Sequence, residues 1–70
     1  MKTEVKIKTP YIELDSLLKY ASLCMTGGEA KIVIKGGEVL VNGEVCTMRK
    51  KKLYPEDSVT YNGKTIKVVG

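Results

Sequence analysis

The stretch TGGEAKIVIKGGEVLVNGEVC, residues 26–46, decides the fold that we predict for this chain. It opens with a capping-box pattern, in which the side chain of Thr26 caps the first turn of a helix and Glu29 reaches back to Thr26. The apolar residues behind this start follow helical spacing and are Ala30, Val33 and Ile34. Gly36 and Gly37 supply the left-handed conformation that commonly ends a helix. The first part of the stretch is therefore predicted to be a short helix.

The second part of the stretch changes from helical spacing to alternation. Asn42-Gly43 is a strong hairpin signal, because a type I′ turn needs a positive φ at both central positions. The strand pairs that a two-residue turn implies are Val41 with Glu44, Leu40 with Val45 and Val39 with Cys46. The face that carries Val39, Val41 and Cys46 is predicted to pack on the helices. Leu40 and Val45 lie on the opposite face, which we expect the terminal strands to cover.

The chain before residue 26 alternates first and then becomes helical. Residues 2–8 place Val5 and Ile7 on one side and charged residues on the other, which predicts a half-buried strand at the edge of a sheet. Pro10 ends it, since proline cannot donate to a strand ladder. The next apolar residues, Leu14, Leu17, Leu18 and Ala21, recur at helical spacing. They predict a second short helix, whose positive end suits Asp15.

The chain after the hairpin is predicted to hold two further strands. A loop from Met48 to Leu53 leads into a turn at residues 54–57, where proline and aspartate are typical. Strands follow at residues 58–61 and 64–69, joined by a tight turn at Asn62-Gly63. The order is one strand, two helices and four strands. The sequence therefore predicts a single α+β domain over residues 1–70.

The composition narrows the classes of function. The chain has 70 residues, two cysteines and no histidine. A structural zinc site lacks its usual ligands, and a Cys-His or Ser-His pair cannot form. We therefore expect no metal, no cofactor and no enzymatic activity. Cys24 and Cys46 are interpreted as two small buried hydrophobic residues in a reducing compartment, although they could in principle pair.

The location of the protein is predicted from segments that the sequence lacks. No run approaches the roughly 18 apolar residues of a membrane span. The alternating N-terminus also lacks the continuous apolar segment of a secretory signal. We therefore expect a cytoplasmic protein.

The positive charge is bunched along the chain. The net charge is +4, and four of the twelve lysines and arginines stand together at residues 49–52. A surface that concentrates positive charge attracts polyanions. An ordinary solvated loop is the alternative interpretation of this run.

Four segments together resemble the S4 RNA-binding domain. They are Ile12–Leu18, Thr26–Lys31, Gly37–Cys46 and Leu53–Val59, so the resemblance spans roughly residues 12–60. The chain is most similar to the small stand-alone bacterial S4-like proteins. This resemblance implies an α-L-like fold, with two short helices packed on a small, mainly antiparallel sheet. It also implies binding of structured RNA, such as ribosomal RNA or a ribosome-assembly intermediate.

The chain departs from the family pattern at two positions. Gly27 stands where family members commonly carry an arginine, which removes one expected phosphate contact. Glu56 precedes Asp57 where the family usually has glycine. Lys31, one turn along the helix from Gly27, is expected to compensate in part for the missing arginine.

A candidate RNA site combines a helix start with the basic run. First-turn N–H groups and glycines allow close approach of a phosphate, and long cations supply the opposite charge. The predicted RNA-binding residues are Thr26, Gly27, Gly28, Lys31, Lys35, Arg49, Lys50, Lys51 and Lys52. We expect them to border one shallow groove. The four tyrosines, at positions 11, 20, 54 and 61, are interpreted first as residues that cap the core, with stacking on unpaired bases left open.

Two other classes of function remain as alternatives. A β-grasp carrier would fit the size and the C-terminal residues Val68-Val69-Gly70, but carriers of that kind end in two glycines and have one central helix. A protein-interaction domain would dock on an acidic partner through the same basic run.

Overall fold

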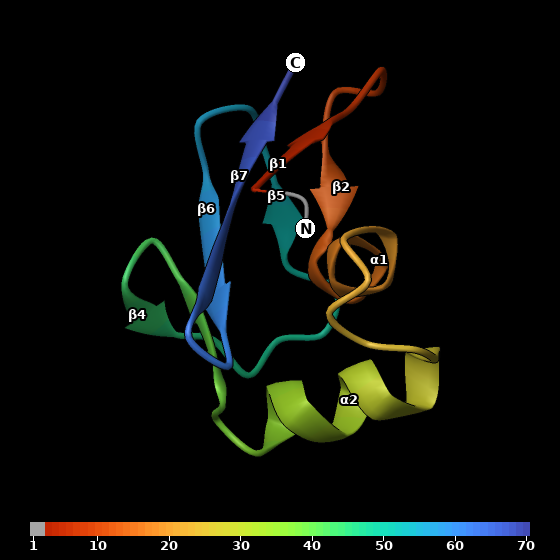
Figure 1. Cartoon of the computed structure of the whole chain (residues 1–70), viewed down its shortest axis with the longest axis vertical. Helices are drawn as coiled ribbons and strands as arrows, with labels where there is room; N and C mark the ends of the chain where they lie inside the picture. The colour runs from red at the N-terminus through yellow and green to blue at the C-terminus, as the bar shows by residue number, and fades with distance from the viewer. Residues whose placement is uncertain (1–2) are drawn as a thin grey trace.

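The computed structural model describes residues 3–70, which form two helices and seven strands around one apolar core (Figure 1). The elements in chain order are β1 (Glu4–Lys6), β2 (Ile12–Glu13), α1 (Leu14–Tyr20), α2 (Gly27–Lys35), β3 (Val39–Val41), β4 (Glu44–Val45), β5 (Lys52–Leu53), β6 (Ser58–Tyr61) and β7 (Lys64–Val69). Lys2, which the sequence places in the first strand, lies outside the described residues. The α+β class is confirmed.

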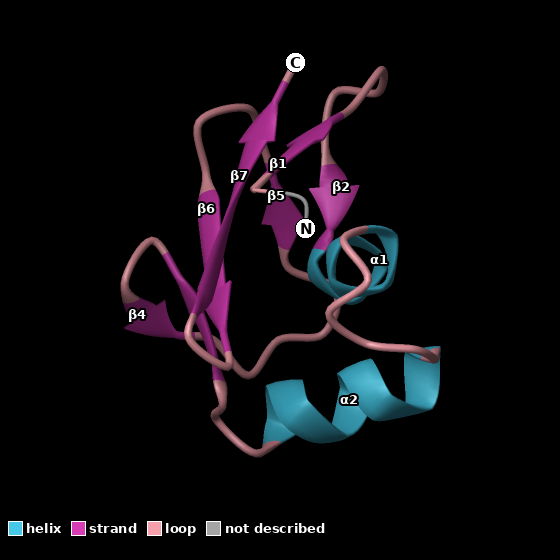
Figure 2. Cartoon of the chain, viewed as in Figure 1, coloured by secondary structure: helices cyan, strands magenta, loops and turns pink. Residues whose placement is uncertain are grey.

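Five of the strands form the main sheet, in the order β1-β7-β6-β3-β4. Neighbouring strands are antiparallel except β1 and β7, which run parallel. Strand β1 is an edge strand, as its lysines predicted. Figure 2 shows both helices on the same side of this sheet. The predicted arrangement of two short helices on a mainly antiparallel sheet is thus confirmed.

The core lies between the helices and the sheet. The predicted apolar face of α1 is buried in full, with Leu14, Leu17 and Leu18 completely inaccessible. The sheet contributes Val5, Val39, Val59, Ile66 and Val68, and α2 contributes Ala30, Val33 and Ile34. These aliphatic side chains fill the space that aromatic residues occupy in many domains. Helix α1 has only seven residues, so this packing rather than intrinsic propensity stabilises it.

The start of α2 is capped as the sequence predicted, with one difference. The Glu29 N–H donates to Oγ1 of Thr26 over 3.1 Å, which satisfies one N–H of the first turn. The Glu29 carboxylate, however, accepts from the Met25 N–H over 2.7 Å instead of from Thr26. The chain is therefore fixed one residue before the cap, which orients the segment that leads in from α1.

The end of α2 depends on the predicted glycine pair. Gly37 has a φ of +76°, in the left-handed region that favours glycine. The Gly37 N–H donates to the Ile34 carbonyl and the Glu38 N–H to the Val33 carbonyl, both over 3.1 Å. This pattern is a Schellman motif, which closes the last turn and directs the chain into β3.

Both Asn-Gly turns adopt the predicted conformation. Asn42 and Gly43 have φ values of 51° and 85°, and Leu40 pairs with Val45 as expected. The second turn, at Asn62-Gly63, joins β6 to β7 with positive φ at both positions. The register predicted for the β3–β4 hairpin is confirmed.

The outer face of the β3–β4 hairpin corrects one prediction. Val45 is 60% exposed and Leu40 is only half-buried. The terminal strands β1 and β7 do not cover these residues, because they extend the same sheet in its own plane. Alternation alone shows which residues share a face but not whether another layer covers that face.

Residues 48–53 correct a second prediction, since the predicted loop ends in a strand. Strand β5 pairs antiparallel with β2, with Ile12 opposite Leu53 and Glu13 opposite Lys52. Leu53 is fully buried and attaches this small ladder to the core. The following turn contains Glu56 at a φ of 84°. The S4 RNA-binding domain, which the sequence resembles, commonly has glycine at this position, and the left-handed backbone gives the physical reason.

Candidate nucleic-acid interface

The basic loop, defined as Arg49–Lys52, is attached to the start of α1 by its backbone. The Leu14 N–H donates to the Lys51 carbonyl over 2.9 Å, and the Asp15 N–H donates to the Arg49 carbonyl over 3.2 Å. Glu13, the N-cap residue of α1, provides no side-chain cap. Carbonyls of the basic loop thus satisfy first-turn N–H groups that would otherwise lack partners. The loop is held in one place before any ligand arrives.

Ion pairs add to this attachment. Oδ2 of the buried Asp15 lies 3.2 Å from Nζ of Lys50 and 3.8 Å from Nε of Arg49. Oε1 of Glu13 lies 3.5 Å from the same Lys50 nitrogen. The hydrogen bond and charge of Asp15, followed by the charge of Glu13, raise the pKa of Lys50. Lys50 stays protonated, but acidic residues of the same chain offset part of the positive charge.

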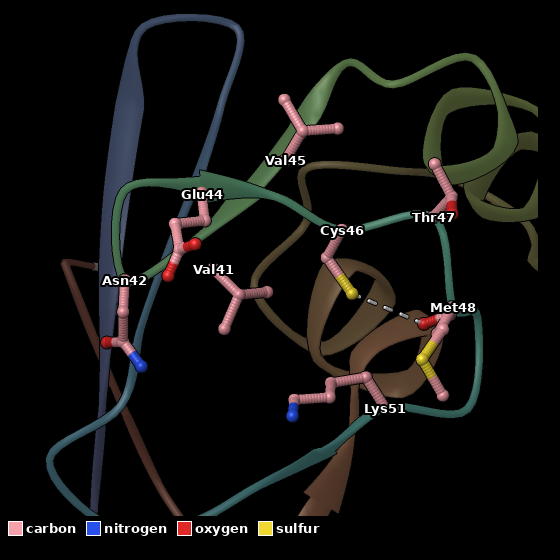
Figure 3. Close-up of a pocket in the computed structure, with 8 residues that line it drawn as sticks. All are labelled: Val41, Asn42, Glu44, Val45, Cys46, Thr47, Met48 and Lys51. Carbon is pink, nitrogen blue, oxygen red and sulfur yellow. Dashed lines mark hydrogen bonds between the residues drawn. The ribbon is translucent and has the colours of Figure 1, made fainter.

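Lys51 and Lys52 point into different surroundings. Lys51 lines an open depression of about 360 Å³ between the β3–β4 hairpin and the segment that follows it, and its side chain reaches below Val41 (Figure 3). The depression is lined by Val41, Asn42, Glu44, Val45, Cys46, Thr47, Met48 and Lys51. Nζ of Lys52 lies 5.0 Å from the centroid of the Tyr11 ring, in a cation–π arrangement. The four neighbouring cations therefore differ in what they can contact.

The start of α2 forms the second group of predicted residues. A Cβ built on Gly27 would lie 3.9 Å from Nζ of Lys19, so this lysine stands beside the glycine start. Sequence reasoning missed Lys19, although its place in the last turn before the connection to α2 was a usable signal. The carboxylate of Glu29 also lies at this helix start, where it would disfavour an incoming phosphate. Lys31 and Lys35 are exposed on α2.

The two groups lie at opposite ends of α1. The basic loop contacts Leu14 and Asp15, which lie in the first turn of α1. Gly27 lies beside Lys19, which is in the last turn of α1. A seven-residue helix is about 10 Å long. A groove bordered by both groups would therefore run along α1.

The tyrosines divide into two sorts. Tyr61 is partly buried and packs against the core, in agreement with the interpretation of the tyrosines as residues that cap the core. Tyr11, Tyr20 and Tyr54 are 36%, 55% and 48% exposed, so core capping does not account for them. Tyr11 and Tyr54 are neighbours, with ring centroids 6.0 Å apart.

The acidic and cysteine side chains are the other candidates for chemistry among the described residues. Within residues 3–70 there is no cluster of three or more histidine, cysteine or acidic side chains that could hold a metal ion. Both cysteines are free thiols; Cys24 is buried, and Cys46 is half-buried. Burial, together with the charge of Glu29, raises the pKa of the Cys24 thiol, which makes it less reactive. Neither helix of the described part is long and apolar enough to cross a membrane.

Comparisons with known proteins agree with this fold. The chain is 37% identical over 62 residues to "Putative RNA-binding protein YbcJ" of Escherichia coli (strain K12), covering 89% of both chains. It is 40% identical over 63 residues to "Probable ribosome maturation protein RlbA" of Bacillus subtilis (strain 168), covering 90% of this chain and 89% of that protein. The solution structure of E. coli YbcJ, which is described as revealing an ALFAL motif involved in RNA-binding, matches with a TM-score of 0.76 and 32% identity. That match covers 100% of this chain and 90% of the YbcJ chain. A family model described as S4 domain matches residues 5–69, and the chain therefore belongs to the S4 domain family.

Proposed function

We propose that this protein is a cytoplasmic, non-catalytic module that binds structured RNA through the two basic groups at the ends of α1. The observation that carries the proposal is the basic loop, in which four consecutive cations stand on a backbone that is hydrogen-bonded to α1. A loop that is already ordered loses little conformational entropy when it binds. Its cations are therefore well suited to contact a phosphate backbone of fixed shape.

The proposed recognition is of RNA shape more than of base sequence. Double-stranded RNA hides its base edges in a deep, narrow groove, so proteins contact its phosphates and 2′-hydroxyls. The basic loop contacts the first turn of α1, and Lys19 in the last turn of α1 stands beside Gly27. A seven-residue helix is about 10 Å long, which allows contacts to separated phosphates. Lys19, Lys31 and Lys35 would make the second set of contacts. Lys19 would supply the positive charge beside Gly27, which has no side chain of its own.

The proposed target is ribosomal RNA or an assembling ribosomal particle. The printed name of RlbA refers to ribosome maturation, and that of YbcJ to RNA binding. Both relatives are matched over most of their length, so the likeness is not confined to a shared fragment. These names support the target class for this chain and motivate a direct test.

The test compares two variants of equal charge change in binding to ribosomal RNA at several salt concentrations. In the first variant, Arg49, Lys50, Lys51 and Lys52 become glutamine. In the matched control, Lys6, Lys8, Lys64 and Lys67, which lie on or beside the β1 and β7 strands, become glutamine. About five phosphate contacts give the natural protein a log–log salt slope of roughly −3 to −4. The loop variant loses most of this slope, and the control variant keeps it.

Equal binding by the two variants, or a slope near zero for the natural protein, would contradict the proposal. Polyglutamate serves as a second polyanion. If it competes as well as RNA does, the surface is a docking site for acidic proteins instead. Cosedimentation with ribosomal particles then tests the target, because a general RNA-binding protein would not prefer one particle.

A further inference from the structure

Tyr11 and Tyr54 form a cross-strand pair at the end of the β2–β5 ladder. Because Ile12 pairs with Leu53, the antiparallel register places Tyr11 opposite Tyr54. The ring centroids are 6.0 Å apart with an interplanar angle of 54°. Such pairs stabilise a short ladder, but these rings remain 36% and 48% exposed. Packing in the core therefore does not explain two aromatic residues at this position.

Lys52 joins the tyrosine pair to the basic loop. It lies diagonally across the ladder from Tyr11, and its Nζ is 5.0 Å from the Tyr11 ring centroid. The Tyr11 ring also neighbours the Tyr54 ring, so Lys52 and Tyr54 lie on the same side of the ladder. The exposed rings are thus continuous with the residues that we propose to contact phosphates.

The surface beside Tyr11 is hollow. An open depression of about 380 Å³ is lined by Thr9, Pro10, Tyr11, Ile12, Glu13 and Ser16. This volume is at the lower end of the range for small-ligand sites. The depression includes Tyr11 but neither Tyr54 nor Lys52, so it leaves room for a planar ring on the Tyr11 side of the pair, where Glu13 and Ser16 supply polar atoms.

The position of Tyr54 is fixed by hydrogen bonds of its backbone. Its N–H donates to Oδ2 of Asp57 over 2.8 Å, and its carbonyl accepts from the Asp57 N–H over 3.0 Å. Oδ1 of Asp57 accepts in turn from Nδ2 of Asn42 over 3.1 Å. Tyr54 is therefore held by a turn that is itself bonded to the β3–β4 hairpin. Exposed aromatic rings on a fixed backbone are a preorganised surface for stacking.

We propose that Tyr11 and Tyr54, with Lys52, form a stacking site for one unpaired nucleobase of the RNA whose phosphates lie along the basic loop. This inference rests on the proposed function. Bases within a duplex are already stacked on one another, so only an unpaired base presents a free face. Each base that stacks on an aromatic side chain adds substantially to affinity, whatever its identity. The site therefore directs the module to junctions where a duplex meets an unpaired nucleotide.

The test uses two RNA probes with equal numbers of phosphates, a blunt duplex and a duplex with one unpaired nucleotide. The natural protein is expected to prefer the second probe about tenfold. Tyr11→Leu and Tyr54→Leu each remove most of this preference and leave duplex binding and its salt slope unchanged. Tyr54→Phe keeps the preference, because the ring and not the hydroxyl stacks. Tyr20→Leu, at the last residue of α1, is the matched control and keeps it too.

A second readout follows the rings themselves. The chain has four tyrosines and no tryptophan, so tyrosine fluorescence reports on them directly. The unpaired probe is expected to quench this fluorescence in the natural protein and in Tyr20→Leu, but much less in Tyr11→Leu. Thermal unfolding of each variant establishes that loss of preference is not loss of fold.

The outcomes separate this inference from the proposed function. A natural protein that binds both probes equally with a steep salt slope retains the proposed function and overturns the stacking site. Leu variants that keep the preference overturn it as well. A natural protein that binds neither probe contradicts the proposed function itself. A variant in which Arg49, Lys50 and Lys51 become glutamine, and Lys52 is kept, weakens binding to both probes alike and leaves their ratio unchanged.

Discussion

The two ends of α1 hold their positive charge in opposite ways. At the first turn, Arg49 and Lys50 are paired with Asp15, and the backbone of the basic loop is hydrogen-bonded to the helix. Around the last turn, Lys19 stands beside Gly27, and Lys31 on α2 is exposed. One end therefore gives its cations a fixed direction at the cost of some charge. At the other end, no ion pair in the part of the chain that the structure describes holds Lys19 or Lys31, although Glu29 lies nearby, and these long side chains are left to adjust.

This difference indicates a division of work in RNA binding. Side chains that are oriented before binding favour one arrangement of phosphates and so contribute to selectivity. Exposed lysines on a helix face attract RNA of many shapes and contribute mainly to the rate of encounter. Variants at each end separate the two contributions.

The largest effect is expected from Leu53→Ala, which removes core packing beneath the basic loop at the first turn of α1. Leu53 is fully buried and attaches β5, and with it the basic loop, to the rest of the molecule. A cavity of this kind costs about 3 kcal/mol of unfolding free energy, a large share of the stability of so small a domain. Urea denaturation measures this loss. Leu40→Ala is the control, since Leu40 is only half-buried, and an equal loss from both would mean that Leu53 does not anchor the ladder.

Asp15→Asn removes the charge that orients the basic loop and keeps the shape of the side chain. A carboxylate in the first turn of a helix stabilises it by up to about 1 kcal/mol, so the midpoint of thermal unfolding should fall. Release of Lys50 and Arg49 should at the same time steepen the salt dependence of RNA binding by about one unit of slope. Unchanged slope in a folded variant would show that Asp15 does not offset these cations.

Thr26→Ala alters the other end by removing the cap of α2. Loss of an N-cap side chain costs about 1 kcal/mol, because the Glu29 N–H loses its partner. Thr47→Ala, in an exposed position on the loop after β4, should cost much less. Thermal unfolding of the two variants side by side gives the difference. RNA binding at the basic loop should be unaffected by either, and a loss there would mean that the two ends are coupled.

The smallest effect is expected from Glu56→Gly, and it should be stabilising. Glu56 adopts a φ of 84°, which glycine tolerates far better. Its ion pair with Lys67, over 3.1 Å, joins two exposed side chains and contributes little. The net gain is about 0.5 kcal/mol after allowance for the greater freedom of glycine in the unfolded chain. Glu56→Ala keeps the strained backbone and should show no gain in the same denaturation experiment.

The parts of the fold that the sequence predicted are those with local causes. The cap at Thr26, the glycine pair that ends α2 and the two Asn-Gly turns each depend on a few neighbouring residues. The apolar faces of both helices follow from their spacing in the same way. The start of α2 was thus predicted from the residues themselves, whereas its role in RNA binding, like that of the basic loop, stays a prediction.

The parts that were missed depend on contacts between distant residues. Strands β2 and β5 have two residues each, which is too short for alternation to show, and they form only because the folded core brings them together. Asp15 was predicted as a dipole partner, but its ion pairs depend on where the basic loop passes α1. The proximity of Lys19 to Gly27 likewise depends on the turn between the two helices.

The parallel pairing of β1 with β7 has a consequence for the order in which the molecule is completed. Val5 pairs with Val68, so one edge of the sheet joins residues from opposite ends of the described chain. Such a contact closes a long loop, and its entropic cost falls late in folding. During synthesis the helices and the β3–β4 hairpin can form as soon as they emerge. Strand β1, however, must wait for β7, and until then Val5 and Ile7 stay uncovered.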